Sequence, residues 1–292
     1  MSADGIPFSK GHGTGNDFVL LPDPDGLLDI GTEQVKAVCD RHFGIGADGV
    51  LRVVRSERTQ EGAAHGRGAP EWFMDYRNAD GSLALMCGNG IRVFARFLVD
   101  SGLASPGSHE ILTRGGVRRV EVGAGGDIGV DMGAVTREGY HGVVTVTLAG
   151  ACWSGRGLGM PNPHAVVIVD DLEALPTRLP EPEVGPASMY PDGVNVEFVQ
   201  VLASVAGGPA HIRMRVHERG SAETLSCGTG ACAAGVVAAE RLGLPVDSDI
   251  RVEVPGGTLV VARRPGDRVH LAGPAELVAD GVIRADWWKD HS

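Results

Sequence analysis

The sequence lacks an excess of basic residues, because its 26 Lys and Arg residues are outnumbered by 37 Asp and Glu residues and the net charge is −11. Nucleic-acid-binding proteins normally present a basic face, so this balance argues against a nucleic acid or an acidic membrane surface as partner. Long apolar runs are also absent, and stretches such as 165–169 fall far short of the roughly 20 residues of a membrane helix. The amino terminus has no basic segment followed by an apolar stretch. We therefore expect a cytosolic protein without membrane or nucleic-acid partners.

A disulfide framework is missing as well. The 5 cysteines are an odd number scattered along 292 residues, unlike the dense, even pattern of a small secreted domain. Reduced thiols are the expectation. The length and the hydrophobic content of 43% allow a large core, and chains of this size commonly divide into two domains.

One unusual segment occurs twice. Met86-Cys87-Gly88-Asn89-Gly90 recurs as Ser226-Cys227-Gly228-Thr229-Gly230, and each copy is followed by an apolar run. Asn78 precedes the first cysteine by nine residues, and Glu218 precedes the second by nine. A second pair of similar segments, 11–21 and 157–167, places an Asn after a Gly-rich turn and ahead of an apolar strand. Two matched pairs at nearly the same offset indicate an internal duplication.

The elements around these repeats favour an α+β fold of two pseudo-symmetric domains. Short β-like runs dominate, at 117–122, 142–148, 194–201, 212–216 and 258–262. The runs 91–99 and 231–239 are apolar on nearly every side, so each predicted helix must be enclosed by protein. We expect each half to wrap a mixed sheet around one central helix whose amino-terminal end carries the cysteine. The expected limits are 1–133 and 134–275, with 276–292 returning to the first half.

Two stretches between these elements have the composition of loose surface loops. Residues 56–70 are rich in Gly, Ala and charge, and residues 175–191 are rich in Pro.

A cysteine at the start of a helix can support a thiolate, because unpaired backbone N–H groups and the helix dipole stabilise negative charge. Two thiols on opposite faces of one carbon could invert its configuration, one removing a proton while the other returns one. The backbone N–H groups of Gly88, Asn89, Gly228 and Thr229 would hold the carboxylate of the reacting centre. Such chemistry requires neither a metal nor another cofactor.

A cysteine can also pack in the core or bind a metal instead of taking part in catalysis. A single Cys-Gly-x-Gly is weak, since Cys is often a small buried hydrophobe; its duplication with matching flanks favours catalysis. Cys39, Cys152 and Cys232 are expected to pack in the core. Cys227 with Cys232 gives Cys-x4-Cys without a second pair, which argues against zinc.

Further polar residues are candidates for binding an amino acid. Asn162-Pro163-His164 is a rigid turn that would direct polar groups one way, although a structural histidine is the alternative. Glu218 and Arg219 could engage an ammonium and a carboxylate, or simply form a surface ion pair. Four asparagines lie beside Gly or Pro turns, where Asn often serves the local backbone or could line a neutral pocket: Asn16, Asn78, Asn162 and Asn195.

Together these motifs resemble the diaminopimelate epimerase family. The resemblance rests on 11–18, 78–90, Asn162-Pro163-His164, 218–230 and the closing Pro255-Gly256-Gly257 and Gly273-Pro274, so it covers nearly the whole chain. It implies a pyridoxal-independent epimerase that interconverts LL- and meso-diaminopimelate on the lysine and cell-wall route. A fold of two similar domains around central helices and a homodimer are also implied.

The resemblance assigns roles by position. Cys87 and Cys227 are similar to the family's two acid/base thiols, and His164 and Glu218 to the groups that support their proton transfers. Substrate binding is implied for these residues: Asn16, Asn78, Gly88, Asn89, Asn162, Asn195, Glu218, Arg219, Gly228 and Thr229.

Two positions depart from the family pattern. Gly49 stands where many members have a Gln that contacts substrate, so that contact is expected to be absent or replaced. Ala279 stands where some members have a Tyr that supports dimer contacts, which leaves the homodimer open.

Three other functions compete. Proline and hydroxyproline racemases have the same fold and two cysteines, but they typically show His where this chain has Asn89 and an Asp-type approach to the second cysteine. A non-catalytic amino-acid binding protein would need no thiols. A thiol redox protein would bring its cysteines close in sequence, as Cys-x-x-Cys does.

Overall fold

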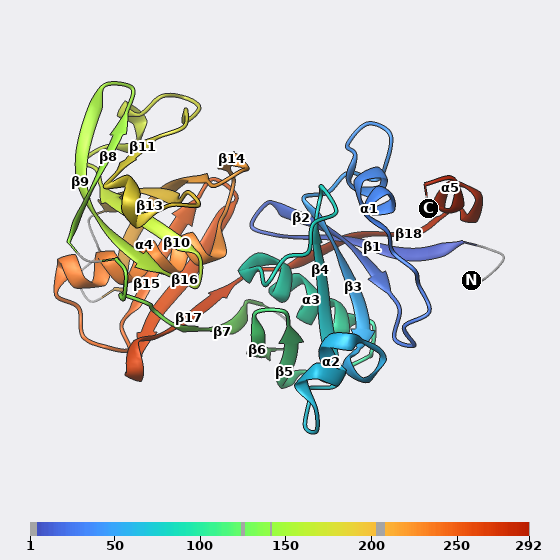
Figure 1. Cartoon of the computed structure of the whole chain (residues 1–292). Coiled ribbons are helices and arrows are strands. Elements are labelled where there is room, and N and C mark those ends of the chain that lie inside the picture. Colours follow the sequence, from blue (N-terminus) through green and yellow to red (C-terminus); the bar gives the residue numbers. More distant parts are fainter. Residues whose placement is uncertain (1–4, 124–125, 141, 203–207, 292) are drawn as a thin grey trace. The chain divides into compact units, whose positions relative to one another are not determined.

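The computed structural model describes residues 5–123, 126–140, 142–202 and 208–291 (Figure 1). The chain divides into two compact units. The N-terminal unit runs to Val130 and takes up the chain again from Pro274, whereas the C-terminal unit is Asp131–Gly273. The outer limits of the expected domains, residues 1 and 292, lie outside the described residues.

The N-terminal unit is built on a mixed sheet. Its strands are β1 (Ile6–Gly13), β2 (Asn16–Pro22), β3 (Gly49–Arg55), β4 (Trp72–Asn78), β5 (Gly107–Thr113), β6 (Gly116–Val122), β7 (Ile128–Ala134, which continues past the unit boundary) and β18 (Glu276–Ile283). They pair in the order β18-β1-β2-β3-β4-β5-β6-β7, and only the β2/β3 and β4/β5 pairs are parallel. The C-terminal strand β18 is therefore an integral part of this sheet.

The C-terminal unit repeats this arrangement. Its strands are β8 (Val143–Leu148), β9 (Ala151–Gly159), β10 (Pro163–Ile168), β11 (Glu183–Gly185), β12 (Asn195–Leu202), β13 (Ala210–Glu218), β14 (Ala222–Thr224), β15 (Asp249–Val254), β16 (Gly257–Arg264) and β17 (Arg268–Gly273). They pair in the order β11-β8-β9-β10-β12-β13-β15-β16-β17, with parallel pairs at β10/β12 and β13/β15; β14 adds to β13.

The matching pair sequence makes the two units equivalent strand by strand. Phe18 opposes Gly49 in the parallel pair of one unit, and His164 opposes Asn195 in the parallel pair of the other. In each unit the chain then forms an antiparallel strand pair and passes through one helix. The strand after the helix pairs in parallel with the second strand of that pair. The duplication inferred from the sequence thus extends to the register of the strands.

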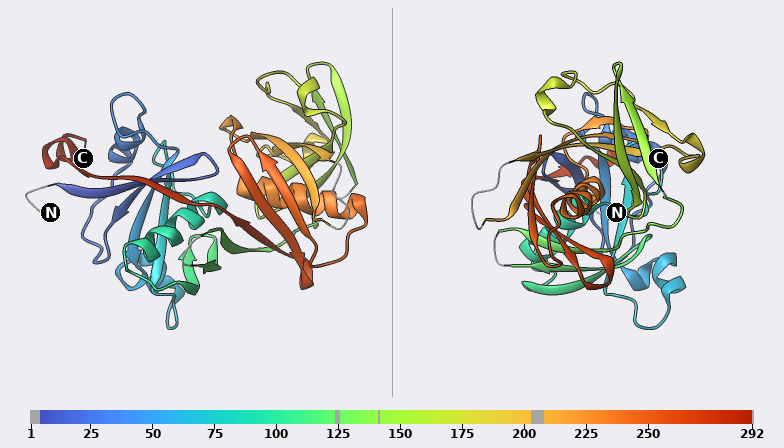
Figure 2. Two further views of the ribbon diagram at one scale, coloured as in Figure 1. Left: turned by 180° about the vertical axis from the view of Figure 1, so that it is seen from behind. Right: turned by 90° about the vertical axis from the view of Figure 1, so that its left-hand side faces the viewer.

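Each unit encloses one long helix, as the apolar runs require. Helix α3 (Gly88–Asp100) lies against β1, β2, β3, β4, β6 and β18, and helix α4 (Gly228–Leu242) lies against β9, β10, β12, β13, β15, β16 and β17 (Figure 2). Cys87 is the N-cap of α3 and Cys227 the N-cap of α4. The expected central helices and the positions of their cysteines are confirmed.

The two stretches expected to be loose loops contain ordered elements. Residues 56–70 form a 3-10 turn, η1 (Ser56–Arg58), and helix α2 (Gln60–His65), whose N-cap Thr59 accepts a hydrogen bond from Gly62. Residues 175–191 contain β11 and a second turn, η3 (Ala187–Met189). The loop prediction for 175–191 was wrong because Leu179 and Tyr190 bury their side chains in the core of the C-terminal unit. In 56–70, Thr59 orders the chain by donating to the carbonyl of Ser56 and accepting from Gly62.

The remaining helices are short: α1 (Thr32–Cys39), α5 (Ala285–Asp290), η2 (Leu172–Ala174) and η4 (Pro265–Asp267). Helices α1 and α5 cover one end of the N-terminal sheet, where Val35, Val38 and Trp288 join its core.

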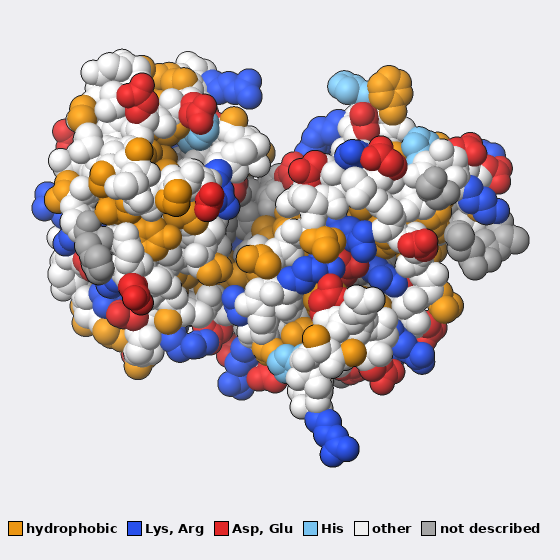
Figure 3. All heavy atoms as spheres, viewed as in Figure 1, with side chains coloured by type: hydrophobic (Ala, Val, Ile, Leu, Met, Phe, Trp, Pro, Cys, Tyr) orange, Lys and Arg blue, Asp and Glu red, His pale blue; other side chains and the backbone are white. Residues whose placement is uncertain are grey.

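The surface carries both signs of charge. On the face shown in Figure 3, acidic and basic side chains are interspersed over both units. Within the described ranges, no helix is long and apolar enough to cross a membrane.

Candidate active site

Cys87 begins α3 from an extended backbone, with φ −138° and ψ 125°. Its Sγ accepts a hydrogen bond of 3.4 Å from the N–H of Gly90, so the sulfur takes the place that an N-cap oxygen usually fills. Gly90 leaves little space, since a Cβ there would lie 3.3 Å from Phe18 and 3.5 Å from Leu51. The first turn of α3 therefore packs against apolar side chains of β2 and β3.

Asn16 is the polar partner of this thiol. Its Oδ1 lies 3.6 Å from Cys87 Sγ and 3.3 Å from Asn89 Nδ2, and its own Nδ2 donates to Asp48 over 2.7 Å. Arg41 in turn holds Asp48 at 2.7 Å. The amide of Asn16 is thus oriented by a carboxylate that the sequence gave no reason to select.

Asp17, the neighbour of Asn16, is fixed from two sides. Arg41 donates two hydrogen bonds to its carboxylate, and Lys10 lies 2.6 Å away. Burial opposes ionisation of Asp17, but the hydrogen bonds from Arg41 and Lys10 outweigh it and hold its pKa well below the usual range. This cluster ties the start of β2 to Lys10 of β1 and to Arg41, which follows α1.

The start of α3 is supported from inside the unit by a fully buried arginine. Arg92 donates to the carbonyl of Gly88 over 3.0 Å and to Asn89 Oδ1 over 3.1 Å. Asn89 is only 1% exposed, so in this structure its side chain serves the helix start rather than solvent.

Asn78 and Gly49 face each other at the end of the β3/β4 pair. Asn78 donates to Ser82 over 3.0 Å. A Cβ on Gly49 would lie 2.6 Å from the carbonyl oxygen of Arg77 and 2.7 Å from the Tyr76 ring, so the backbone here leaves no space for a Gln side chain at position 49.

Cys227 repeats the N-cap arrangement at α4, with Sγ accepting from Gly230 over 3.3 Å and lying 3.3 Å from the Thr229 hydroxyl. Burial raises the pKa of the Cys227 thiol well above its ordinary value, and the nearby carboxylates of Glu218 and Glu197 raise it further. Both effects favour the protonated thiol.

Glu218 lies at the end of β13, nine residues before Cys227. Its Oε1 accepts a hydrogen bond of 2.5 Å from Thr224. Burial raises the pKa of Glu218, although hydrogen bonds from Thr224 and Cys227 oppose this. A carboxyl whose pKa is raised and which lies beside a thiol is suited to exchange a proton with it.

His164 is completely buried on β10 and forms hydrogen bonds through both ring nitrogens. Nδ1 lies 2.7 Å from Glu197 Oε1, and Nε2 lies 3.0 Å from Asn162 Oδ1. Glu197 is also completely buried. Sequence reasoning missed Glu197, although a carboxylate within the apolar run of 194–201 was a signal that it must have a partner.

Asn195 and Arg219 meet at the same edge as Glu218. Asn195 Oδ1 accepts from the backbone N–H of Arg219 over 2.9 Å, and the exposed Arg219 guanidinium donates to the carbonyl of Asp192 over 3.0 Å. This bond holds the guanidinium at Asp192 and uses only one of its N–H groups, so the others can bind a ligand.

The other three cysteines differ from one another. Cys39 and Cys232 are buried as expected, and burial raises the pKa of Cys39 to about 12. Cys152 is exposed on β9, so its predicted core position was wrong. Among the described side chains, no group of three or more His, Cys, Asp or Glu could hold a metal ion.

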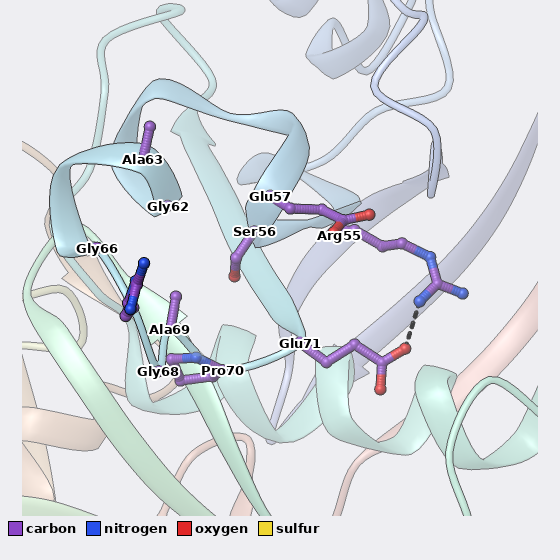
Figure 4. Close-up of a pocket in the computed structure, with 11 residues that line it drawn as sticks. Arg55, Ser56, Glu57, Gly62, Ala63, Gly66, Gly68, Ala69, Pro70 and Glu71 are labelled. Atoms are coloured by element: carbon purple, nitrogen blue, oxygen red, sulfur yellow. Dashed lines mark hydrogen bonds and ion pairs between the residues drawn. The ribbon is translucent and has the colours of Figure 1, made fainter.

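A separate hollow in the N-terminal unit contains none of these residues (Figure 4). It is lined by η1, α2 and the segment 66–71, and its Arg55 is paired with Glu71 at 2.5 Å. The predicted site residues instead form two sets, one in each unit. The first set is Asn16, Asn78, Cys87, Gly88 and Asn89; the second is Asn162, His164, Asn195, Glu218, Arg219, Cys227, Gly228 and Thr229.

Comparison with known proteins agrees with this arrangement. The family model described as diaminopimelate epimerase matches residues 8–138 and 158–278. The diaminopimelate epimerase of Streptomyces coelicolor is 49% identical over 288 residues, covering 97% of this chain and 96% of the relative. That of Thermobifida fusca is 47% identical over 285 residues, covering 95% and 97%.

Solved structures of more distant proteins share the fold. A phenazine biosynthesis protein of the PhzF family from Bacillus anthracis matches with a TM-score of 0.66 at 15% identity, covering 95% of this chain and 98% of that one. A hydroxyproline epimerase from Agrobacterium vitis matches with a TM-score of 0.65 at 12% identity, covering 96% and 93%.

Proposed function

The chain belongs to the diaminopimelate epimerase family, and from this premise we propose that it interconverts LL- and meso-2,6-diaminopimelate, with Cys87 and Cys227 as its two acid/base groups. The observation that carries the proposal is the equivalence of the two cysteines. Each is the N-cap of the one helix that its unit encloses, and each sulfur accepts the N–H of the glycine three residues on.

The proton transfers balance without a cofactor. One cysteine, as thiolate, takes the proton from the α-carbon, and the C–H electron pair moves towards the carboxylate. The other cysteine, as thiol, delivers its proton to the opposite face and becomes the thiolate, so the product has the inverted configuration. This requires the two sulfurs to approach opposite faces of one carbon.

An α-proton of an amino acid is weakly acidic, so the developing negative charge must be stabilised. Helix N-termini present unpaired N–H groups, and we assign those of Gly88, Asn89, Gly228 and Thr229 to the substrate carboxylate. The buried position of Gly88 and Gly228 keeps water from competing for these bonds.

Supporting roles follow from the contacts within each unit. Glu218 interacts with Cys227, so we assign it to assist the proton transfers of that cysteine. His164 interacts electrostatically with Glu218, and we assign it the same task. We assign Asn16, Asn78, Asn162, Asn195, Glu218 and Arg219 to substrate binding, with the Arg219 guanidinium gripping a carboxylate at the non-reacting centre.

The test is exchange of substrate α-protons with deuterated water, comparing LL-diaminopimelate with proline. Wild-type protein should introduce label into diaminopimelate and produce the meso isomer, and Cys87→Ser and Cys227→Ser should each abolish epimerisation while retaining the circular-dichroism spectrum of the folded protein. Label that enters only proline would overturn the substrate assignment. Full turnover by either Ser variant would overturn the two-thiol mechanism.

A further inference from the structure

The two units differ at one pair of equivalent positions behind their cysteines. Because Phe18 and His164 occupy the same register position, Leu51 on β3 corresponds to Glu197 on β12. Leu51 opposes Tyr76 and Glu197 opposes Val216, at matching places in the antiparallel pairs. One unit therefore buries an apolar Phe–Leu pair where the other buries a His–Glu pair.

The Glu197 carboxylate touches the first turn of α4. A Cβ added to Gly230 would lie 2.7 Å from Glu197 Oε1, whereas the same atom on Gly90 would lie 3.3 Å from the far end of Phe18. Glu197 Oε1 also lies 2.7 Å from His164 Nδ1. Glycine at position 230 thus leaves room for the carboxylate beside the helix N-terminus, where the dipole favours negative charge.

Burial of this pair requires a functional explanation. Both side chains are 0% exposed, and Glu197 Oε2 has no hydrogen-bond partner among the described residues. An unpaired buried oxygen is costly, and the Phe18–Leu51 pair fills the same place in the other unit without that cost. A carboxylate retained under these conditions acts on the group that it does contact, the His164 ring.

We propose that Glu197 is a positioning residue for the epimerisation: its carboxylate keeps the Nδ1 proton of His164, so that the proton exchanged with the site is the one on Nε2, which Nε2 donates to Asn162 Oδ1 when the ring is doubly protonated. The inference rests on the proposed function and deepens it. The donor role of Nδ1 fixes both the tautomer and the plane of the ring. The ionisable groups that act on this pair from neighbouring elements are Cys227, Glu218 and Tyr190.

The pair also makes the site chemically one-sided. Its equivalents Phe18 and Leu51 have no ionisable group, whereas Glu197 acts on Cys227 within the C-terminal unit. The two cysteines therefore lie in different local environments.

Three variants of the full chain test the proposal: Glu197→Gln, Glu197→Leu and the double variant His164→Phe with Glu197→Leu. The double variant reproduces the Phe18–Leu51 pair and should remain folded, because an apolar pair of similar volume can replace a buried ion pair. We expect every variant to lose about tenfold or more in kcat, since positioned acid–base groups contribute at least this much. KM for diaminopimelate should stay within about twofold, and the pH–kcat profile of Glu197→Gln should be displaced.

Histidine ring 15N shifts show whether Glu197 sets the His164 tautomer, and the displaced pH–kcat profile shows whether that tautomer matters for turnover. In the wild-type protein His164 should give the Nδ1–H pattern, and in Glu197→Leu the ring should populate both tautomers. Glu253→Gln is the matched control, because Glu253 Oε1 lies 2.9 Å from His211 Nε2 in a partly exposed His–Glu pair that includes none of the assigned site residues. It should leave kcat, the pH profile and the His164 signals unchanged.

Wild-type kcat and an unshifted pH profile in Glu197→Leu, or wild-type activity in the double variant, would overturn the proposal. If Glu197→Leu does not fold, Glu197→Gln and the double variant give the same decision. Failure of the proposed function looks different: wild-type protein would not exchange diaminopimelate protons, whereas the His164 tautomer would still respond to Glu197.

Discussion

Asn16 donates a hydrogen bond of 2.7 Å to Asp48, and this bond turns the other end of its amide towards the Cys87 thiol. An amide that is not held can rotate and present its N–H₂ group instead. Asp48 is itself held by Arg41, so the orientation is set through three side chains. Asp48, which precedes Gly49, therefore orients the Asn16 side chain at Cys87.

Removing this carboxylate should impair catalysis more than folding. We expect Asp48→Ala to lower kcat/KM for diaminopimelate by about tenfold or more, because the amide of Asn16 loses its fixed orientation. The free energy of unfolding should fall by only about 1 kcal/mol, the usual contribution of such hydrogen bonds. Steady-state kinetics and urea unfolding measure the two effects.

Glu173→Ala is a suitable control, since it removes an exposed carboxylate paired with Arg213 at 3.0 Å. It should change neither quantity measurably. Equal activity of Asp48→Ala and Glu173→Ala would show that Asn16 needs no partner.

Glu218 should make the protein less stable as the pH rises. Burial raises its pKa in the folded state above the ordinary value of 4.5, so the folded protein binds this proton more tightly than the unfolded chain. The resulting stabilisation is complete below pH 4.5 and is lost as the pH rises through the folded-state pKa. Each unit of difference between the two pKa values corresponds to about 1.4 kcal/mol.

Glu218→Gln removes this titration while keeping an oxygen for Thr224. Its melting temperature relative to wild type should therefore improve between pH 4 and pH 8, although epimerisation is lost because the amide cannot exchange a proton. Calorimetry across this range, with activity measured on the same samples, tests both statements. A melting difference that is independent of pH would contradict the assigned burial effect.

Much of the site could be predicted from the sequence because the duplication constrains it. Cys87 and Cys227 were located from their repeated flanks, and the apolar runs behind them were enclosed helices as expected. Long, uniformly apolar helices have few other places in a fold. The local sequence pattern was informative where a single helix or strand determines the position of a residue.

Contacts between segments that are distant in the sequence could not be predicted from local pattern. Glu197 meets His164 only through the parallel β10/β12 pair, and Asp48 meets Asn16 only through β2/β3. Cys152 was misplaced because a strand residue can face either side, and its sequence gave no indication that it faces solvent.

Equivalent glycines in the two helices should respond differently to alanine. Alanine usually favours a helix by about 1 kcal/mol over glycine. At Gly90 the new Cβ would lie 3.3 Å from the tip of Phe18, a contact that a small ring shift relieves. At Gly230 it would lie 2.7 Å from the Glu197 carboxylate. Gly230→Ala should therefore lose more stability and more kcat than Gly90→Ala, as measured by thermal unfolding and turnover. Equal effects would mean that Glu197 moves aside freely.

The proposed mechanism also predicts a chemical link between the units. A mechanism in which the two sulfurs approach opposite faces of one carbon predicts that they can also approach each other closely enough to form a disulfide. A thiol oxidant such as diamide accepts the two electrons and two protons that this bond releases. Oxidised protein should therefore yield a peptide joining Cys87 to Cys227, and it should lose activity until a reductant restores it.

The exposed Cys152 serves as an internal control, because its random reaction would give dimers between chains rather than an internal link. Mass spectrometry of unreduced digests that shows Cys152 products but never the Cys87–Cys227 peptide would argue against convergence of the two thiols.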